Sequence, residues 1–135
     1  MKYFSRNRKE IVKMKVTNMI SPQTGCKVAN QYIIKDMENH KIYFQSYDTV
    51  VACVEYAGRA GEVILVKGAC YFSKTTSKYL YKFLEEYTLI NSCYNNKKGI
   101  AELIKRGEIR EVESFWKWGA GEILPFLYFY ELFNS

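Results

Sequence analysis

The sequence has 135 residues, with 20 Lys and Arg against 14 Asp and Glu, so its formal net charge is +6. Hydrophobic residues make up 48% and charged residues 25% of the chain, which is typical of a globular domain and excludes a disordered chain. The sequence contains neither an apolar run of about 18 residues nor a signal-peptide pattern. We therefore expect a folded, basic, intracellular protein.

Residues 1–10 are expected to form a basic N-terminal arm with a net charge of +3. Its charged residues are Lys2, Arg6, Arg8, Lys9 and Glu10. Residues 11–135 are expected to form a single domain, because no linker, repeat or low-complexity tract interrupts them.

Runs of alternating apolar and polar residues predict short strands. These runs cover 11–18, 27–35, 41–45, 49–56, 62–67 and, less regularly, 108–113. The clearest hairpin joins 49–56 to 62–67 through a glycine-containing turn at 57–61. Residues 68–72 are expected either to prolong that second strand or to bend into the next element.

Two segments have the apolar spacing of helices. The first, 78–87, follows several possible N-capping hydroxyls at 73–77, and the second, 97–106, follows Asn95 and Asn96. The apolar positions are Tyr79, Leu80, Phe83, Leu84, Tyr87, Ile100, Leu103 and Ile104. Together these patterns predict an α+β domain, an antiparallel sheet of about five strands packed against two helices.

The C-terminal segment is crowded with aromatic residues and is interrupted by Pro125. One interpretation is that these side chains close the core, and the other is that they form a partner-docking surface. The candidate docking residues are Trp116, Trp118, Phe126, Phe129, Tyr130 and Phe133.

The four cysteines are widely spaced, which disfavours a zinc site built from two close pairs of ligands. We expect reduced thiols, with Cys53 and Cys70 as buried apolar side chains of strands. The sequence also lacks a carboxylate cluster, a phosphate-binding loop and a nucleophile elbow. The single histidine, His40, is expected in a solvated turn, although a Cys–His pair formed in space stays open. We therefore predict no enzymatic activity, no metal and no cofactor.

A positive surface could form where the arm meets the second helix, with aromatic side chains interleaved for stacking. The candidate basic residues are Lys2, Arg6, Arg8, Lys9, Arg59, Lys97, Lys98, Lys105 and Arg106. The alternative is an ordinary solvated lysine-rich surface, since lysine is less suited than arginine to bidentate recognition.

Three segments of the chain resemble a family of small uncharacterised proteins that phages and plasmids of Firmicutes carry. These segments are 44–52, with Ser-Tyr-Asp-Thr-Val-Val-Ala; 71–84, with Ser-Lys-Thr-Thr-Ser-Lys-Tyr-Leu-Tyr-Lys-Phe-Leu; and 96–109. The pattern covers about residues 28–112, and Tyr71-Phe72-Ser73 departs from the Asp-Tyr-Ser of the family. The resemblance implies a mobile-element setting in the cytoplasm of a bacterial host, and it implies no activity and no catalytic residues.

Small size, missing catalytic groups and surplus aromatic residues favour an accessory protein that binds and inhibits a host defence protein. The most concrete example is an anti-CRISPR inhibitor that binds a Cas effector or another ribonucleoprotein stoichiometrically. The alternative is a nucleic-acid-binding accessory factor in replication, transfer or regulation. No membrane partner is expected, and the oligomeric state stays open.

Overall fold

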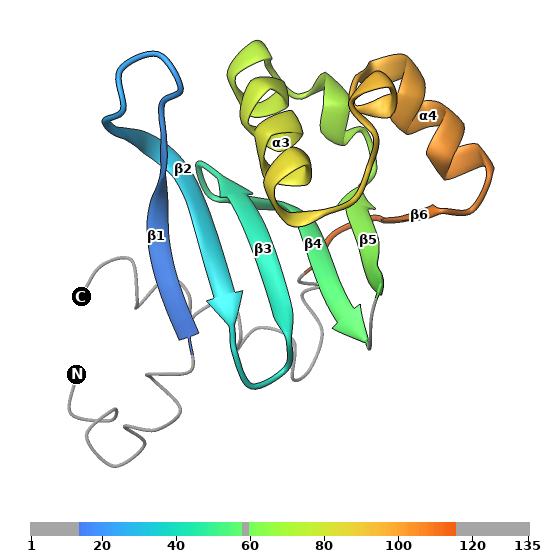
Figure 1. The fold of residues 1–135 in the computed structure, drawn as a ribbon, viewed down its shortest axis with the longest axis horizontal. Helices are drawn as coiled ribbons and strands as arrows, with labels where there is room; N and C mark the ends of the chain where they lie inside the picture. Colours follow the sequence, from blue (N-terminus) through green and yellow to red (C-terminus); the bar gives the residue numbers. More distant parts are fainter. Residues whose placement is uncertain (1–13, 58–59, 116–135) are drawn as a thin grey trace.

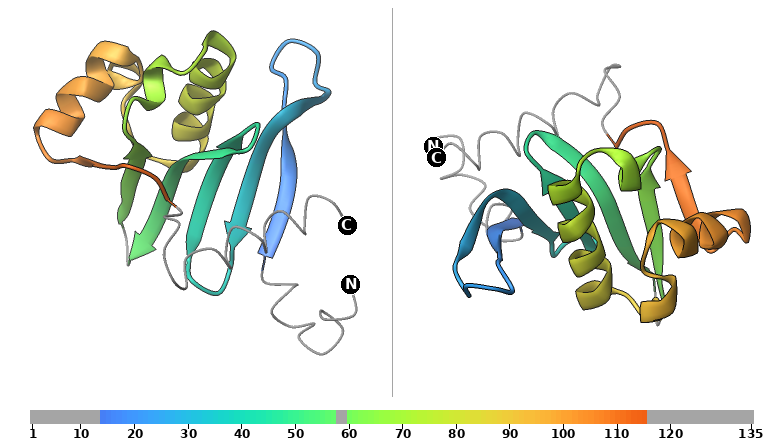
Figure 2. Two further views of the ribbon diagram at one scale, coloured as in Figure 1. Left: turned by 180° about the vertical axis from the view of Figure 1, so that it is seen from behind. Right: turned by 90° about the horizontal axis from the view of Figure 1, so that it is seen from above.

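The computed structural model describes residues 14–57 and 60–115 (Figure 1). The predicted basic arm, Arg59 and the aromatic C-terminal segment lie outside these residues. Within them, one sheet carries two helices on one of its faces (Figure 2). This arrangement confirms the α+β class predicted from the sequence.

The sheet has six strands, and their order in space is their order along the chain. They are β1 (Met14–Ile20), β2 (Lys27–Asp36), β3 (Lys41–Ser46), β4 (Thr49–Ala57), β5 (Ala60–Val66) and β6 (Ile109–Val112). The first five strands pair antiparallel, whereas β6 lies parallel to β5. A parallel pair requires a crossover connection, and the helices lie within that connection.

The crossover contains two short 3₁₀ turns and two α-helices. They are η1 (Ala69–Tyr71), α3 (Lys74–Tyr87), η2 (Ser92–Tyr94) and α4 (Lys97–Lys105). Ser73 caps α3, because its hydroxyl accepts the Thr76 N–H at 3.0 Å. Asn96 caps α4, since its side-chain oxygen accepts the Gly99 N–H at 2.8 Å. Both predicted helices are confirmed, and the first begins four residues earlier than the apolar spacing indicated.

The main core lies between the sheet and α3. The rings of Phe44 on β3 and Phe83 on α3 stack with centroids 5.8 Å apart, and both side chains are fully buried. Ser46 and Thr76 add a buried hydroxyl–hydroxyl hydrogen bond of 2.8 Å between β3 and α3. The apolar residues predicted for the helices pack as expected, with Leu80 and Leu84 also fully buried.

The chain turns sharply after β5. Gly68 has a φ of 77°, a left-handed conformation that glycine adopts without steric cost, and η1 follows it. Residues 68–72 therefore bend into the next element. The turn buries Cys70 and leaves the next two side chains, Tyr71 and Phe72, exposed to solvent.

None of the four cysteines forms a disulfide within the structure. Cys53 is buried in β4 and Cys70 is buried in η1, whereas Cys26 and Cys93 are exposed. Cys70 therefore lies in a turn and not in a strand. No helix in the described part of the chain combines the length and the apolar character needed to cross a membrane.

Candidate functional site

Two adjacent aromatic side chains stand in solvent where the chain enters α3. Tyr71 is 71% exposed and Phe72 is 48% exposed, whereas most large apolar side chains of the described residues are buried. Their exposure follows from the bend at Gly68, which ends β5, and from the cap at Ser73, which starts the helix. The two rings are thus presented outward by short, well-defined local structure.

Three lysines line the same surface hollow as Tyr71, and one of them, Lys78, also donates to the side-chain oxygen of Gln23 at 3.2 Å. Lys74 and Lys78 occupy successive turns of α3, and the ammonium nitrogen of Lys97 on α4 lies 4.9 Å from the centroid of the Tyr71 ring. None of the three lysines forms an ion pair with an acidic residue of the described chain. We call Tyr71, Phe72, Lys74, Lys78 and Lys97 the Tyr71 patch.

All members of the Tyr71 patch except Phe72 line a surface hollow of about 470 Å³. The residues that line it are Cys70, Tyr71, Ser73, Lys74, Ser77, Lys78, Tyr81 and Lys97. The hydroxyl of Ser77 is used internally, since it donates to the Cys70 carbonyl at 2.9 Å. The charged side chains that line the hollow are Lys74, Lys78 and Lys97, and all three are cations.

Burial keeps the deeper groups of the hollow neutral. Desolvation raises the pKa of the Cys70 thiol, and the positive charge of Lys97 opposes part of that shift. Desolvation and the neighbouring Cys70 thiol also raise the pKa of Tyr81. Neither group supplies a negative charge at neutral pH. The thiol of Cys70 and the hydroxyl of Tyr81 therefore do not neutralise the lysines of the hollow.

The N-terminal ends of α3 and α4 lie at the same end of the helical layer (Figure 1). Lys74 and Lys97, in the first turns of these helices, both belong to the Tyr71 patch. A helix N-terminus carries a partial positive charge and normally favours acidic residues. Here neither first turn contains an acidic residue, while Lys74, Lys97 and Lys98 occupy these turns. The local charges therefore work against helix stability and favour an anion bound from outside.

The structure divides the basic residues predicted from the sequence. Lys97 belongs to the Tyr71 patch, and Lys98 is exposed beside it in the first turn of α4. Lys105 and Arg106 lie at the other end of α4, away from that first turn. The candidates in the arm, and Arg59, lie outside the described residues, as do all six predicted docking residues of the C-terminal segment.

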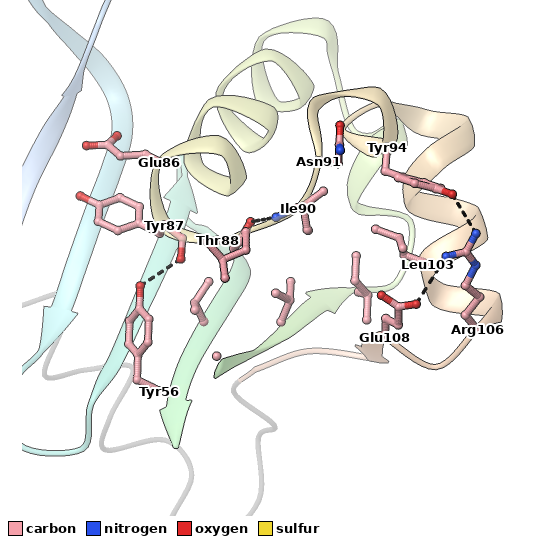
Figure 3. Close-up of a pocket in the computed structure, with 15 residues that line it drawn as sticks. Tyr56, Glu86, Tyr87, Thr88, Ile90, Asn91, Tyr94, Leu103, Arg106 and Glu108 are labelled. Atoms are coloured by element: carbon pink, nitrogen blue, oxygen red, sulfur yellow. Dashed lines mark hydrogen bonds and ion pairs between the residues drawn. The ribbon is translucent and has the colours of Figure 1, made fainter. Parts of the chain in front are cut away.

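A second depression of about 630 Å³ lies at the opposite ends of the two helices (Figure 3). Its floor is apolar and comes from β4, β5, β6 and α4, through Val54, Val63, Ile109 and Leu103. The residues after α3 form its rim, where Leu89 is 96% exposed. Gly61 lines one wall of the depression, where a side chain would not fit without a shift, because a Cβ there would lie 2.9 Å from a methyl group of Val54.

Polar groups around this depression are engaged with each other. The Arg106 guanidinium donates to the Tyr94 hydroxyl at 2.8 Å and pairs with Glu108 at 3.5 Å (Figure 3). It also pairs with Glu102 at 3.3 Å. The Tyr56 hydroxyl donates to the Tyr87 carbonyl at 3.0 Å. The depression can therefore accept an apolar group, but its cation is already neutralised.

His40 and the metal-ligating residue types are the candidates for catalysis that the sequence left open. His40 is exposed in the turn between β2 and β3, and no hydrogen bond joins its ring to a cysteine of the described chain. No group of three or more His, Cys, Asp or Glu side chains in residues 14–57 and 60–115 could hold a metal ion. The absence of enzymatic activity stays a prediction.

Sequence reasoning missed Tyr71 and Phe72 as site residues. The available signal was the pair of aromatic residues directly before a helix-capping serine, because a chain that must turn into a helix cannot continue burying side chains in the sheet. Tyr71-Phe72-Ser73 is also where the chain departs from the resembled pattern. Lys74 and Lys78 were not among the predicted basic residues, because their proximity to Lys97 depends on the fold.

Comparison with known proteins identifies a family but no individual relative. Neither the curated proteins nor the solved structures contain a match to this chain. A family model described as "Family of unknown function (DUF8033)" matches residues 14–101, which is roughly two thirds of the chain and includes β1 to β5, α3 and the first turn of α4. The Tyr71 patch lies wholly within the matched residues. The chain belongs to this family.

Proposed function

We propose that the protein binds single-stranded nucleic acid at the Tyr71 patch. The observation that carries this proposal is the pairing of two exposed aromatic rings with three lysines that lack an acidic partner in the described chain. Aromatic rings stack on unpaired bases, and lysines neutralise the phosphates between them. In this proposal the protein acts by binding the strand.

The chemistry of the patch favours a single strand over a duplex. In a duplex the bases are stacked on one another and are not available to Tyr71 and Phe72, whereas an unpaired strand offers them freely. The cations of the patch are lysines, which act as point charges on phosphate and do not read base edges in pairs of hydrogen bonds as arginine does. Binding is therefore expected to depend strongly on salt and weakly on base sequence.

The setting that we propose is a phage or plasmid accessory protein in the cytoplasm of a bacterial host. Inhibition of a host defence system is compatible with the same patch, since a Cas effector or another ribonucleoprotein exposes RNA as well as protein. In that case Tyr71 and the lysines would contact the guide RNA. The support for this setting is the sequence resemblance, and the support for the contact is the Tyr71 patch.

The proposal is tested by fluorescence anisotropy of a labelled oligonucleotide of about 12 unpaired nucleotides, a length within the usual range for one small domain. The test protein is the full chain carrying Lys74→Gln and Lys97→Gln. The matched control carries Lys27→Gln and Lys105→Gln, which remove the same charge from exposed positions outside the patch. We expect the patch variant to bind at least about tenfold more weakly than the control at low salt.

Two outcomes would contradict the proposal. Equal affinity of the patch variant and the control would place any binding elsewhere on the chain. Absence of binding by the unmodified protein at low salt would remove nucleic acid as the ligand. A second assay measures target cleavage by a purified Cas effector with its guide RNA. If the patch variant still inhibited cleavage, the inhibition would come from a contact with the effector protein and not from the Tyr71 patch.

A further inference from the structure

The sheet has an apolar row on the face opposite α3. Strand register places Val16, Ile34, Tyr43, Cys53 and Ile64 side by side across five strands. Four of these side chains, all but Val16, are at most 7% exposed, and together with Val50 they form a core cluster separate from the main one. We call these five residues the far-face row.

Burial along the central strands shows that both faces of the sheet are covered. Every residue is buried in the runs 43–46 of β3, 50–54 of β4 and 63–66 of β5. Successive side chains of a strand point to opposite faces, so an unbroken buried run requires a layer on each side. Helices α3 and α4 form the layer on one face only (Figure 2). The far-face row needs a cover that the described helices do not provide.

The course of the chain indicates where that cover comes from. After β6 the described chain ends at Phe115, and this ring packs against the cluster of the far-face row. It meets the Tyr43 ring edge to face, with centroids 6.2 Å apart. The chain therefore leaves its last described residue directly at the far face.

The remaining chain has the composition and the length for this role. Residues 116–135 contain three charged side chains, Lys117, Glu122 and Glu131, and are otherwise mostly aromatic and aliphatic. Five strands about 4.8 Å apart span roughly 20 Å, and 20 residues reach about 30 Å even if they are wholly helical. A segment of this kind would bury aromatic and aliphatic side chains on such a row.

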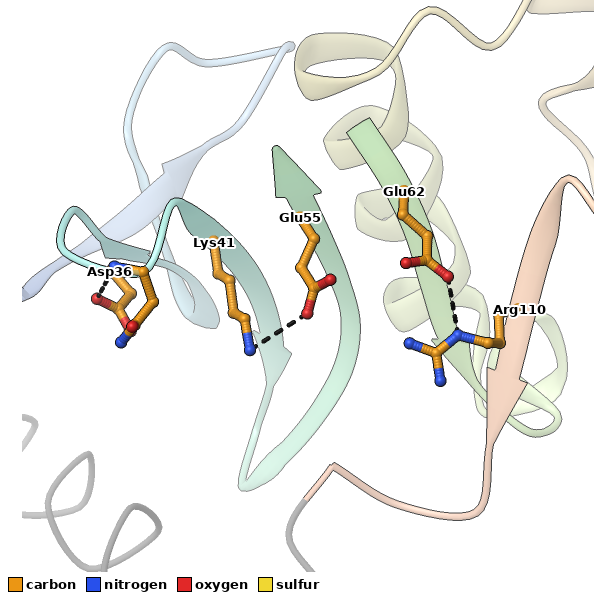
Figure 4. A network of polar contacts seen from close by, with 6 residues as sticks. Asp36, Lys41, Glu55, Glu62 and Arg110 are labelled. Atoms are coloured by element: carbon orange, nitrogen blue, oxygen red, sulfur yellow. Dashed lines mark hydrogen bonds and ion pairs between the residues drawn. The ribbon is translucent and has the colours of Figure 1, made fainter. Parts of the chain in front are cut away.

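Paired charges mark one border of the far-face row. Lys41 lies 3.2 Å from Glu55, and both stand on the same face, two residues further along β3 and β4. Arg110 on β6, the register partner of Ile64, lies 2.8 Å from Glu62, which is two residues from Ile64 on β5 (Figure 4). These charges are satisfied by one another and would be costly to cover with aromatic rings. An apolar cover is therefore confined to the side of the row where Val50 lies.

We propose that residues 116–135 of this chain pack across the far-face row and form the second layer of the domain. The predicted docking residues of that segment then bind this protein's own sheet. A second copy of the chain and a foreign protein are the competing occupants, and each gives a distinct result in the tests below.

The first test compares two buried thiols on a protein in which the exposed Cys26 and Cys93 are replaced by serine. Cys53 belongs to the far-face row, whereas Cys70 belongs to the main core and serves as the matched control. Truncation after Phe115 should raise the rate of Cys53 modification by a thiol reagent more than about tenfold and leave Cys70 protected. A folded truncated protein in which Cys53 stays protected would overturn the proposal.

A truncated chain that unfolds exposes both thiols equally, so a second measurement uses the full chain. Both tryptophans of the protein, Trp116 and Trp118, lie in the proposed cover, which makes their ring protons specific reporters. We expect nuclear Overhauser contacts between the methyl groups of Ile34 or Ile64 and aromatic protons of residues 116–133, within one molecule. Contacts found only between isotopically labelled and unlabelled copies, or no contacts at all, would contradict the proposal.

Discussion

The two ends of the helical layer use similar residues in different ways. At the N-terminal ends, Lys97 stands 4.9 Å over the exposed ring of Tyr71 and has no acidic partner in the described chain. At the C-terminal ends, Arg106 stands 5.0 Å over Tyr94, but Glu102 and Glu108 neutralise it. Both cations lie over an aromatic ring. Lys97 stays free to bind an external anion, whereas Arg106 is used in contacts that stabilise the fold. The pairing of charges, more than their number, distinguishes a binding surface from a structural contact.

The largest expected loss of stability comes from weakening the packing of α3 on the sheet, because α3 runs between the two ends of the helical layer. Phe83 is fully buried, and its ring lies 5.8 Å from that of Phe44 and 5.3 Å from that of Tyr87. We expect Phe83→Ala to lower the free energy of unfolding by about 3–5 kcal/mol, because it leaves a cavity in the main core. Urea denaturation measures this change, with the exposed Glu85→Ala as control. A loss close to that of the control would contradict the assigned core.

A smaller loss is expected when the contact between η2 and α4 is broken. A Cβ on Gly99 would lie 2.2 Å from the carbonyl oxygen of Tyr94, and backbone atoms cannot move aside cheaply. We expect Gly99→Ala to cost about 1–3 kcal/mol of unfolding free energy, and to displace Lys97 and Tyr94 together. Thermal unfolding with Lys98→Ala as control tests this. Unchanged stability of the glycine variant would show that the two ends are not held by this contact.

The pH dependence of stability provides the next comparison. Burial raises the pKa of Cys53 from 9.0 to about 12, so the fold favours the neutral thiol. The contribution is fully present below pH 9 and is lost as the pH rises from 9 towards 12, by at most about 1.4 kcal/mol per pH unit. In urea titrations we expect Cys53→Ala to remove this part of the pH dependence. Parallel stability curves for the two proteins across that range would contradict the assignment.

The smallest expected effect is on the salt dependence of binding, and it compares Lys97 at one end of the helical layer with Arg106 at the other. Lys97→Gln removes a free cation, so the slope of log affinity for a single strand against log salt should fall by about 0.7. Arg106→Gln removes a cation that is already paired, so its slope should match that of the unmodified protein. Anisotropy titrations at several salt concentrations give both slopes. A larger change for Arg106→Gln would invert the comparison between the ends.

Most of the fold follows from the sequence because its local signals agree. Strand alternation, the helical spacing of Leu80 and Leu84, and the capping serine and asparagine all depend on neighbouring residues. The parallel pairing of β6 could not be predicted in this way, because it depends on the length and path of the crossover. The two-sided burial of β4 is visible afterwards in its unbroken run of small apolar residues, 50–54.

The candidate site was predicted less completely, for a physical reason. Lys97 was recognised as basic, but its neighbours Tyr71 and Lys74 lie more than 20 residues away along the chain and meet it only through the crossover. Arg106 was grouped with Lys97 because charge can be read from sequence, whereas its pairing with Glu102 and Glu108 depends on the fold.

The most direct test of the account maps a bound single strand onto the full chain by amide chemical shifts. The account predicts that titration with an unpaired oligonucleotide shifts the amides around Tyr71, Lys74 and Lys97 and leaves those around Leu89 and Arg106 unchanged. Shifts centred on the Arg106 end, or no shifts at low salt, would contradict it.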